Sequence, residues 1–382
     1  MPSPVTPPTT NPASASDEDA VQELTPVDLD RLQILRGYPM VSVLMPTTPG
    51  TGLSPAEGTT LNHLIDRAER RLAAELPATR IAEIIDPLRD LADRVTRARM
   101  GPGLALFGGA GLLEAYRLPL QPQARAVIDP TFATRDLARA VLENPPYRLL
   151  VLASGTARLY VGADRHLGEQ VAGGFPLGEA RSSETTDRRG HLHQAERTHR
   201  DSRRWDSFLR QVDKALSAST RSRDLPLILA ATEPLASRFQ QRTTHHLIGT
   251  VAGNHQRTTA ARLADLARPI VEDHLASERR HALEALDDAI GRRRAVFGID
   301  DVWREAHDGN VALLLVDPDY RLAAVPSPDG RSLEPSSDRE HPAVIDDAVD
   351  EVIEAVERHG GHTCFTSMTT GRSAIAAVLR TT

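Results

Sequence analysis

The chain has 382 residues, of which 40% are hydrophobic and 25% charged, a composition typical of a soluble globular protein with two or three domains. Its formal net charge of −7 argues against a general nucleic-acid coat protein. No apolar run approaches the roughly 20 residues that are needed to cross a membrane. The first residues contain no basic segment followed by an apolar one, so we expect a cytoplasmic protein.

The first residues of the chain, 1–22, are predicted to form a disordered tail, because they are rich in Pro, Ser and Thr and then acidic. An N-terminal α/β domain is expected to follow over residues 23–145. Its predicted elements are a short helix, a buried strand, two amphipathic helices, a β-hairpin and a closing strand, at residues 28–35, 40–45, 61–72, 81–95, 104–118 and 126–128. No Lys-Ser or Lys-Thr pair follows the glycines at residues 108–111, which favours a hairpin turn over a phosphate-binding loop.

A central domain is expected over residues 146–268, after an Asn-Pro-Pro sequence. Strands are predicted at residues 149–153, 157–161, 169–171, 225–231 and 247–251, and helices at residues 205–216 and 233–241. This order of elements predicts an α/β layer with a mixed sheet. We expect capping and hydrogen-bonding roles for a polar cluster around the last strand, which consists of His245, His246, Asn254, His255, Gln256, Arg257 and Arg262.

The central domain contains a protruding basic loop, at residues 180–204, that leads into a strongly periodic helix. Apolar side chains recur on one stripe of that helix, at Trp205, Phe208, Leu209, Val212 and Leu216. The candidate RNA-binding side chains of the loop are Arg188, Arg189, His191, His193, Arg197, Arg200, Arg203 and Arg204. A basic loop on a packed helix is a suitable shape for contacting a phosphate-rich surface. Lys214 is the only lysine of the chain, so arginine density alone is weak evidence for phosphate binding.

A third domain is expected over residues 269–382 as a compact α/β/α sandwich. Helices are predicted at residues 269–293, 301–306 and 345–356, with Asp300 as the cap of the second, and strands or extended segments at residues 311–316, 320–325, 362–366 and 371–379. The single Cys364 lies in an apolar run, which favours a buried, unreactive thiol.

Acidic residues gather in this third domain. Between Asp329 and Glu357 the carboxylates far outnumber the two basic side chains, Arg331 and Arg339. We therefore expect the domain to meet a protein partner and not RNA. Structural roles on exposed helix faces or at helix N-termini, where the helix dipole favours negative charge, are predicted for three carboxylate pairs: Asp287-Asp288, Asp300-Asp301 and Asp346-Asp347.

Three parts of the sequence resemble one protein family. The last domain contains Gly298-Ile299-Asp300-Asp301-Val302 and then Gly309-Asn310-Val311-Ala312, which resemble the last domain of the archaeo-eukaryotic peptide-chain release factors and of Pelota. The element order of the central domain is similar to that of the domain that carries the Gly-Gly-Gln loop in those factors. The N-terminal domain, with its segments at residues 42–47 and 103–107, is similar to the bacterial archaeo-eukaryotic release factor family, whose relatives include Pelota and the hibernation factor Balon.

The resemblance implies a ribosome-directed protein whose middle domain reaches the peptidyl-transferase centre and whose last domain can contact a translational GTPase. Some relatives hydrolyse peptidyl-tRNA, whereas others occupy the A site without catalysis. Hydrolysis of the ester needs a positioned water and close approach of the backbone. The counterpart of the Gly-Gly-Gln sequence here has one glycine and three residues before the glutamine, so Gly190 and Gln194 are the candidate catalytic residues.

Three functions stay open at this point. The first is a translation factor of rescue, hibernation or stress type that occupies the A site and contacts rRNA or the tRNA acceptor end. The second is a peptidyl-tRNA hydrolase that uses Gln194, and the third is a protein-interaction adaptor without an RNA role. The expected partners are the ribosome, its RNA and a translational GTPase, with no membrane. We expect no cofactor and no metal. The only candidate ligands near His191 and His193 are Asp187, Glu196 and His199, and all of them lie on a loop that is predicted to be mobile, whereas zinc requires a third and usually a fourth fixed ligand.

Overall fold

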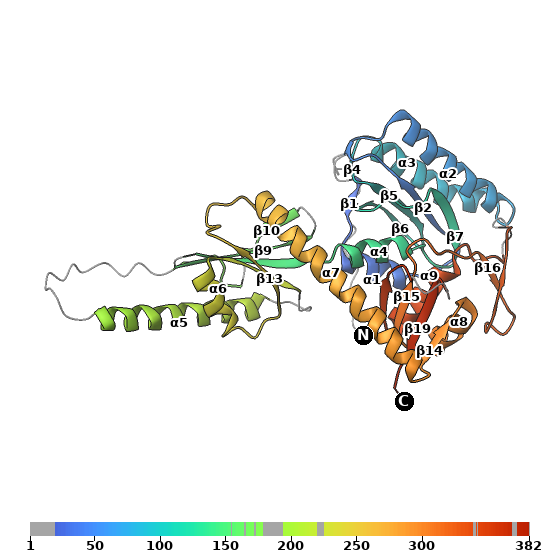
Figure 1. Ribbon diagram of the computed structural model, residues 1–382. Helices are drawn as coiled ribbons and strands as arrows, with labels where there is room; N and C mark the ends of the chain where they lie inside the picture. Colours follow the sequence, from blue (N-terminus) through green and yellow to red (C-terminus); the bar gives the residue numbers. More distant parts are fainter. Residues whose placement is uncertain are drawn as a thin grey trace, which may run out of the picture. The chain divides into compact units, whose positions relative to one another are not determined.

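The structure of the chain is a computed structural model (Figure 1). It describes residues 20–153, 155–163, 166–171, 173–178, 194–219, 225–338, 341, 343–368 and 373–381, with the backbone alone for residues 194–204. The chain divides into two compact units: unit 1 combines Met1–Glu143 with His281–Thr382, and unit 2 comprises Asn144–Arg280. Helices and strands alternate along both, and each of the three predicted α/β segments contains its own sheet, which confirms the predicted fold class.

A five-stranded sheet forms the centre of the N-terminal part of unit 1. Its strands, in spatial order, are β1 (Gln22–Glu23), β6 (Leu112–Leu118), β5 (Gly103–Gly109), β2 (Met40–Pro46) and β7 (Arg125–Asp129), and the helices on one face are α2 (Pro55–Ala73) and α3 (Ala78–Val95) (Figure 1). Successive side chains of a strand point to opposite faces. Accordingly, Val41 and Val43 pack under α2 and α3, whereas Met40 and Leu44 join the core on the other face.

Local sequence signals explain where the elements of this sheet begin and turn. The helix α2 begins at a capping box, in which Ser54 and Glu57 each accept a hydrogen bond from the other's backbone N–H. The turn between β5 and β6 has positive φ angles at Ala110 (49°) and Gly111 (80°), the conformation of a type I′ hairpin turn. The predicted hairpin turn is therefore confirmed. The N-terminal part also contains a separate two-stranded antiparallel sheet, formed by β3 (Gly50–Thr51) and β4 (Arg99–Met100).

The C-terminal part of unit 1 is built on a four-stranded sheet. Its strands, in spatial order, are β14 (Ala295–Phe297), β19 (Ile375–Leu379), β15 (Val311–Val316) and β18 (His362–Phe365); its helices are α8 (Ile299–His307) and α9 (Ala348–Arg358), and β16 (Ala324–Pro326) pairs with β17 (Leu333–Pro335). Both α8 and α9 pack on one face. Ala282 and Leu286, near the end of α7 (Ala260–Gly291), pack on the other. This arrangement is the predicted α/β/α sandwich.

One apolar core joins the two parts of unit 1. Phe107 and Phe132 from the N-terminal part meet edge to face, with ring centroids 5.1 Å apart, and belong to the same buried cluster as Leu314 and Val352 from the C-terminal part. The second face of the five-stranded sheet is therefore covered by α1 (Pro26–Ile34), α4 (Arg135–Glu143) and the C-terminal part itself. Segments more than 200 residues apart in sequence share a single interior.

Charged side chains are buried at the same junction. Asp136, which is 1% exposed, accepts hydrogen bonds from Arg125 (2.7 Å) and Arg321 (3.0 Å). The guanidinium of Arg135 donates to the backbone oxygen of Pro318 (2.9 Å) and lies 3.5 Å from Asp347. Burial alone would raise the pKa of Asp136, but the neighbouring guanidiniums outweigh it and keep that pKa below the usual carboxyl value.

A second polar contact at this junction involves two carboxyl groups on α9. The backbone N–H of Thr134 donates to Asp350 (2.9 Å), and the Thr134 hydroxyl lies 3.4 Å from Asp350 and 3.3 Å from Glu354. Burial is the main cause that raises the pKa values of both carboxyl groups, that of Glu354 to about 8. The next cause is the negative charge of Glu354 for Asp350, and that of Glu351 for Glu354. Near neutral pH the pair therefore retains a proton that exposed carboxyl groups have lost.

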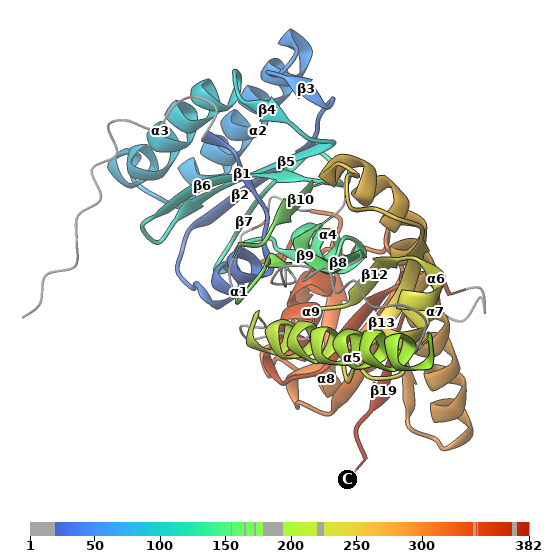
Figure 2. The ribbon, with the colours of Figure 1, turned by 90° about the vertical axis from the view of Figure 1, so that its left-hand side faces the viewer.

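Unit 2 contains a six-stranded mixed sheet with helices on both faces. The strands along the main path are β10 (His166–Glu169), β9 (Thr156–Ala163), β8 (Tyr147–Ala153), β12 (Leu227–Ala231) and β13 (Leu247–Ala252), while β11 (Leu177–Gly178) pairs with β9. The helices α5 (Gln194–Ser219) and α6 (Glu233–Gln240) pack on one face (Figure 2), and the first half of α7 packs on the other. A Cβ at Gly249 would come within 2.4 Å of Ile270, so glycine lets α7 approach β13 closely.

Two helices begin earlier than expected. The polar segment 194–204, predicted as loop, forms the first turns of α5; it has no apolar periodicity, but Gln, Ala, Glu and Arg favour a helix intrinsically. The helix α7 begins at Ala260 and not near Pro269, which lies inside it. The sequence prediction also missed α4, a helix whose buried face includes charged residues. Of the segment 320–325, which was predicted as a strand or extended segment, only the last two residues belong to β16.

The predicted surroundings of several acidic residues are wrong. Asp346 and Asp347 are 8% and 7% exposed and pair with arginines, so they do not lie on an exposed face, although Asp347 does cap α9. The cap of α8 is Gly298, with Asp300 in its first turn. Cys364 is half-buried, not fully buried. Among the helices that the structure describes, none is long and apolar enough to cross a membrane.

Replacing Asp136 with asparagine should lower the free energy of unfolding by about 3–5 kcal/mol, because Arg125 and Arg321 would stay buried without their counter-charge. Urea denaturation of the two proteins measures this difference. The matched control is Asp86→Asn, which removes the same charge from an exposed position on α3 and should change stability by less than about 0.5 kcal/mol. Equal effects of the two substitutions would contradict a structural role for the buried network.

The raised pKa of Glu354 also predicts how stability depends on pH. An acid whose pKa is raised by folding binds more protons in the folded state than in the unfolded state, so its contribution is present below about pH 4.5 and is lost as the pH rises to about 8. The free energy of unfolding should therefore fall over this window in urea titrations. The fall should be shallower in Glu354→Gln and unchanged in the exposed control Glu83→Gln. A Glu354→Gln profile parallel to that of the unchanged chain would refute the assignment.

Candidate nucleic-acid interface

The candidate site lies at the end of the unit 2 sheet where the parallel strands finish. The strands β8, β12 and β13 are parallel neighbours and have their carboxyl ends at Ala153, Ala231 and Ala252. The short strand β11 runs antiparallel to β9 and pairs Gly178 with Thr156, so the chain leaves the sheet at this same end before it enters α5. In open α/β sheets ligands bind preferentially at the carboxyl ends of strands.

The direction of α5 follows from its side-chain contacts. Asp213 accepts a hydrogen bond from the hydroxyl of Thr243 (2.7 Å), and Ser217 lies 3.3 Å from His245. Thr243 and His245 precede β13, so the last turns of α5 lie at the amino end of the sheet. The first turns of α5 therefore point towards the carboxyl end, and in Figure 1 the helix begins beyond the ends of the strands.

The second half of α5 is fixed to the sheet by apolar packing. The predicted stripe is confirmed: Phe208, Leu209, Val212 and Leu216 are buried in one cluster with strand and α6 side chains, and Trp205 packs against the cluster. Trp205 and Phe208 also meet edge to face, with ring centroids 6.1 Å apart. A helix anchored in this way provides a rigid support for whatever lies at its start.

Polar side chains from two other segments converge on the carboxyl end. Arg158 on β9 makes two hydrogen bonds to Glu169, at 2.7 and 2.6 Å, and donates to the backbone oxygen of Gln256 at 3.3 Å. Gln256 in turn reaches the hydroxyl of Thr156 at 3.5 Å. The hydrogen bonds to Glu169 raise the pKa of Arg158, because they stabilise the charged guanidinium. These contacts tie the loop after β13 to the edge of the sheet where β11 ends.

The same loop and the start of α7 present positive charge. Arg257 and Arg262 are exposed, and neither forms an ion pair within the part of the chain that the structure describes. His255 contacts the hydroxyl of Thr258 (3.3 Å) and the backbone oxygen of Ala252 (3.2 Å), so it shapes the loop. We call this region the carboxyl-end surface: Arg158, residues 253–262 and the first turns of α5.

The predicted site residues fall in three groups with respect to this surface. Arg188, Arg189, Gly190, His191 and His193 lie outside the described residues. Gln194 is the first residue of α5, and four arginines follow within its first turns, at Arg197, Arg200, Arg203 and Arg204. These four were expected on a loop and are on a helix, so their spacing is set by helical geometry. Their backbone lies at the same end of the sheet as the polar loop after β13.

Hydrogen bonds are observed for the side chains of four predicted cluster residues: His245, Asn254, His255 and Gln256. The sequence analysis identified this cluster, but it did not predict that the cluster lies at the same end of the sheet as the arginine-rich start of α5. It did not identify Arg158 as a site residue. Only the register of β11 and the direction of α5 bring the two segments together, and neither is visible in local sequence. Among the described residues there is no group of His, Cys, Asp or Glu that could hold a metal ion, and His191 and His193 lie outside them.

Comparison with known proteins gives a family match for the part of the chain that contains this surface. Residues 146–310 match the model of the bacterial archaeo-eukaryotic release factor family 3. The predicted relationship to bacterial archaeo-eukaryotic release factors is therefore confirmed over these residues. No curated protein matches the chain.

The solved structures that resemble the chain include the following three. The archaeal translation termination factor aRF1 shares 15% identity, with 96% of this chain and 99% of that chain covered and a TM-score of 0.24. Dom34 of S. cerevisiae, described as a termination-like factor interacting with Hbs1, shares 12% identity over 73% of each chain, with a TM-score of 0.40. Archaeal Pelota, in a model bound to the ribosome with ABCE1, shares 14% identity over 94% of this chain and 95% of that chain, with a TM-score of 0.39.

Proposed function

We propose that this chain is a cytoplasmic, ribosome-associated translation factor of rescue, hibernation or stress type. In this proposal it occupies the A site and contacts rRNA or the acceptor end of a tRNA with the basic residues of the segment 180–204. The observation that carries the proposal is the carboxyl-end surface, where exposed Arg257 and Arg262 lie at the same end of the sheet as the arginine-rich start of α5. The family match over residues 146–310 supports translation as its setting.

The chemistry of the carboxyl-end surface suits RNA. Phosphate groups are recognised by arginine side chains that are free to form charge-assisted hydrogen bonds. The described arginines of unit 1 at the buried junction already have carboxylate partners, whereas Arg257 and Arg262 have none among the described residues. A net charge of −7 is compatible with this role when the positive charge is gathered on one end of one sheet.

The same proposal assigns contact with a translational GTPase to the C-terminal part of unit 1. Several of its carboxylates, including Asp346, Asp347 and Asp350, are buried against the chain's own N-terminal part. They serve folding, so a GTPase would have to recognise other groups of this part.

Removing the two exposed arginines in Arg257→Gln/Arg262→Gln should weaken ribosome binding and reduce the dependence of log affinity on log salt by about one to two units of slope. Co-sedimentation of the full chain with ribosomes at several salt concentrations measures both quantities. The matched control is Arg238→Gln/Arg280→Gln, which removes the same charge from exposed positions away from the carboxyl end of the sheet. Ribosome binding that survives both Arg257→Gln/Arg262→Gln and a charge reversal at Arg203 and Arg204 would favour an adaptor without an RNA role.

A second candidate function is hydrolysis of peptidyl-tRNA. The observation in its favour is the position of Gln194 as the first residue of α5, four residues after Gly190, on a helix that is firmly packed at its other end. Its backbone belongs to the end of α5 that lies at the carboxyl end of the sheet. Such a residue could orient the attacking water or stabilise the developing negative charge.

If the chain is a hydrolase, Gln194→Ala should lower the rate of peptide release from ribosome-bound peptidyl-tRNA by about 10²–10³-fold while leaving sedimentation with ribosomes nearly unchanged. Release of a labelled peptide is the measurement. Gln211→Ala, an exposed position further along the same helix, is the control and should have no effect. Ribosome binding without any release by the unchanged chain would exclude hydrolysis and leave occupation of the A site.

A further inference from the structure

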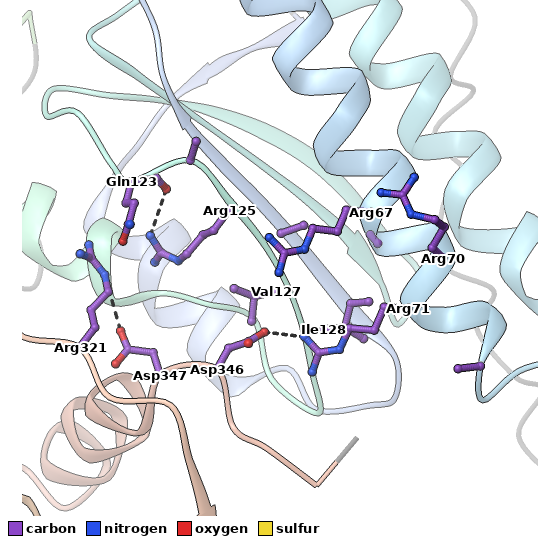
Figure 3. A pocket seen from close by; sticks show the side chains of 14 residues that line it. Arg67, Arg70, Arg71, Gln123, Arg125, Val127, Ile128, Arg321, Asp346 and Asp347 are labelled. Carbon is purple, nitrogen blue, oxygen red and sulfur yellow. Dashed lines mark hydrogen bonds and ion pairs between the residues drawn. The ribbon is translucent and has the colours of Figure 1, made fainter. Parts of the chain in front are cut away.

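A pocket of about 430 Å³ lies in unit 1. It is formed by α2, by β7 with the segment before it, and by the residues just before α9 (Figure 3). Its polar lining consists mainly of arginine and amide side chains: Arg67, Arg70, Arg71, Gln123, Arg125 and Arg321. The volume falls within the range of small-molecule sites.

The inner end of this pocket contains guanidinium groups whose hydrogen-bonding capacity is not used. Arg125 donates through Nη1 to Asp136 (2.7 Å) and to the backbone oxygen of Gln123 (3.4 Å), while its buried Nε and Nη2 find no acceptor among the described residues. The buried Nε of Arg321 likewise finds no acceptor there. Buried donors of this kind normally have a partner, so their presence in a pocket wall points to a bound acceptor.

The carboxylates of the lining do not hydrogen-bond to these nitrogens. Oδ2 of Asp347 lies 3.9 Å from Nε of Arg321, which is an ion-pair distance beyond hydrogen-bond range. Asp346 pairs with Arg71 at 2.7 Å. Asp347 accepts hydrogen bonds from the backbone N–H groups of Val349 (3.2 Å) and Leu322 (3.4 Å). Figure 3 shows both ion pairs of the lining, Asp346 with Arg71 and Asp347 with Arg321.

The pocket also carries an excess of positive charge. Near its inner end, the guanidiniums of Arg125, Arg135 and Arg321 form ion pairs with two carboxylates among the described residues, Asp136 and Asp347. At its rim, the exposed side chains of Arg67 and Arg70 add positive charge from α2, and Arg67 reaches over β7 towards the middle of the pocket (Figure 3). An anion with several oxygens would reduce this repulsion and satisfy the free donors at once.

We propose that this pocket is a binding site for a small molecule that carries phosphate groups. Arginine presents a planar fork of donors that matches phosphate oxygens, and five arginines line the pocket. Among the described residues that line the pocket none is aromatic, so no ring there would stack on a nucleobase, and recognition rests on the phosphate groups. Arg125 is mostly buried, with 11% of its side chain exposed, so a compact anion reaches it more readily than a folded RNA does.

Isothermal titration of the full chain with pyrophosphate tests this proposal, with inorganic phosphate and a nucleoside triphosphate as parallel ligands and with sodium chloride at matched ionic strength. Saturable binding of pyrophosphate is the expected result. Competition between pyrophosphate and the nucleotide, with equal affinities, would identify the phosphate groups as the whole ligand. Tighter binding of the nucleotide would mean that its sugar or base contributes as well.

Two variants and a control connect binding to the pocket. Arg67→Gln/Arg70→Gln removes two exposed charges from the rim without touching the buried network, and Arg125→Lys keeps the charge beside Asp136 but removes the fork. Each should raise the dissociation constant for pyrophosphate by about tenfold or more. Arg80→Gln/Arg94→Gln removes two exposed charges from α3 outside the lining and should leave it unchanged. Thermal unfolding confirms that each variant is folded.

Three outcomes would overturn the proposal. One is the absence of saturable binding of all three phosphate ligands at millimolar concentration. Another is an equal loss of affinity in the control and rim variants, which would indicate a general charge effect. The third is binding of RNA, but of none of the small anions, that depends on Arg67 and Arg70. Each result is independent of ribosome binding, because the readout is the affinity of the isolated chain for a small ligand.

Discussion

Unit 1 depends on a buried carboxylate that is shared by arginines from distant parts of the sequence. Asp136 at the start of α4 holds Arg125 from β7 and Arg321 from the segment after β15. Taking these charges out of water is costly, and it is offset only when their geometry and hydrogen bonds are nearly complete. The network therefore specifies how the N-terminal and C-terminal parts meet, while the shared apolar core around Phe107 and Val352 supplies most of the stabilisation.

In unit 2 the proposed function belongs to a surface, and apolar packing, not a buried charge network, holds the helix that carries it. Apolar packing of Phe208, Leu209 and Leu216 fixes the second half of α5, and contacts to Thr243 and His245 set its direction. The first turns are left to project past the strands. A fixed second half and an arginine-rich sequence in the first turns suit a helix that is proposed to bind an RNA surface.

Apolar periodicity was sufficient to predict most helices and strands, including the hairpin at Ala110 and the stripe on α5. It failed where charge takes the place of apolar burial. The helix α4 buries Arg135 and Asp136 beside its apolar residues, and α5 begins in a polar segment. The candidate interface was only half predicted, because β11 and α5 determine which segments meet at the carboxyl end, and that depends on tertiary packing.

Arginine performs two tasks in this chain, and they can be separated only by burial and by partners. With Lys214 as the only lysine, arginine supplies nearly all positive charge, so its frequency says little about binding. Arg135 is 1% exposed and is used in folding, whereas Arg257 is exposed and has no ion-pair partner among the described residues. Arg125 lies between these cases: one of its nitrogens is engaged by Asp136, and two others are buried without an acceptor in the described structure. A side chain that is fixed by one partner and still has free donors is preorganised for a ligand, because the entropy of ordering it has already been lost on folding.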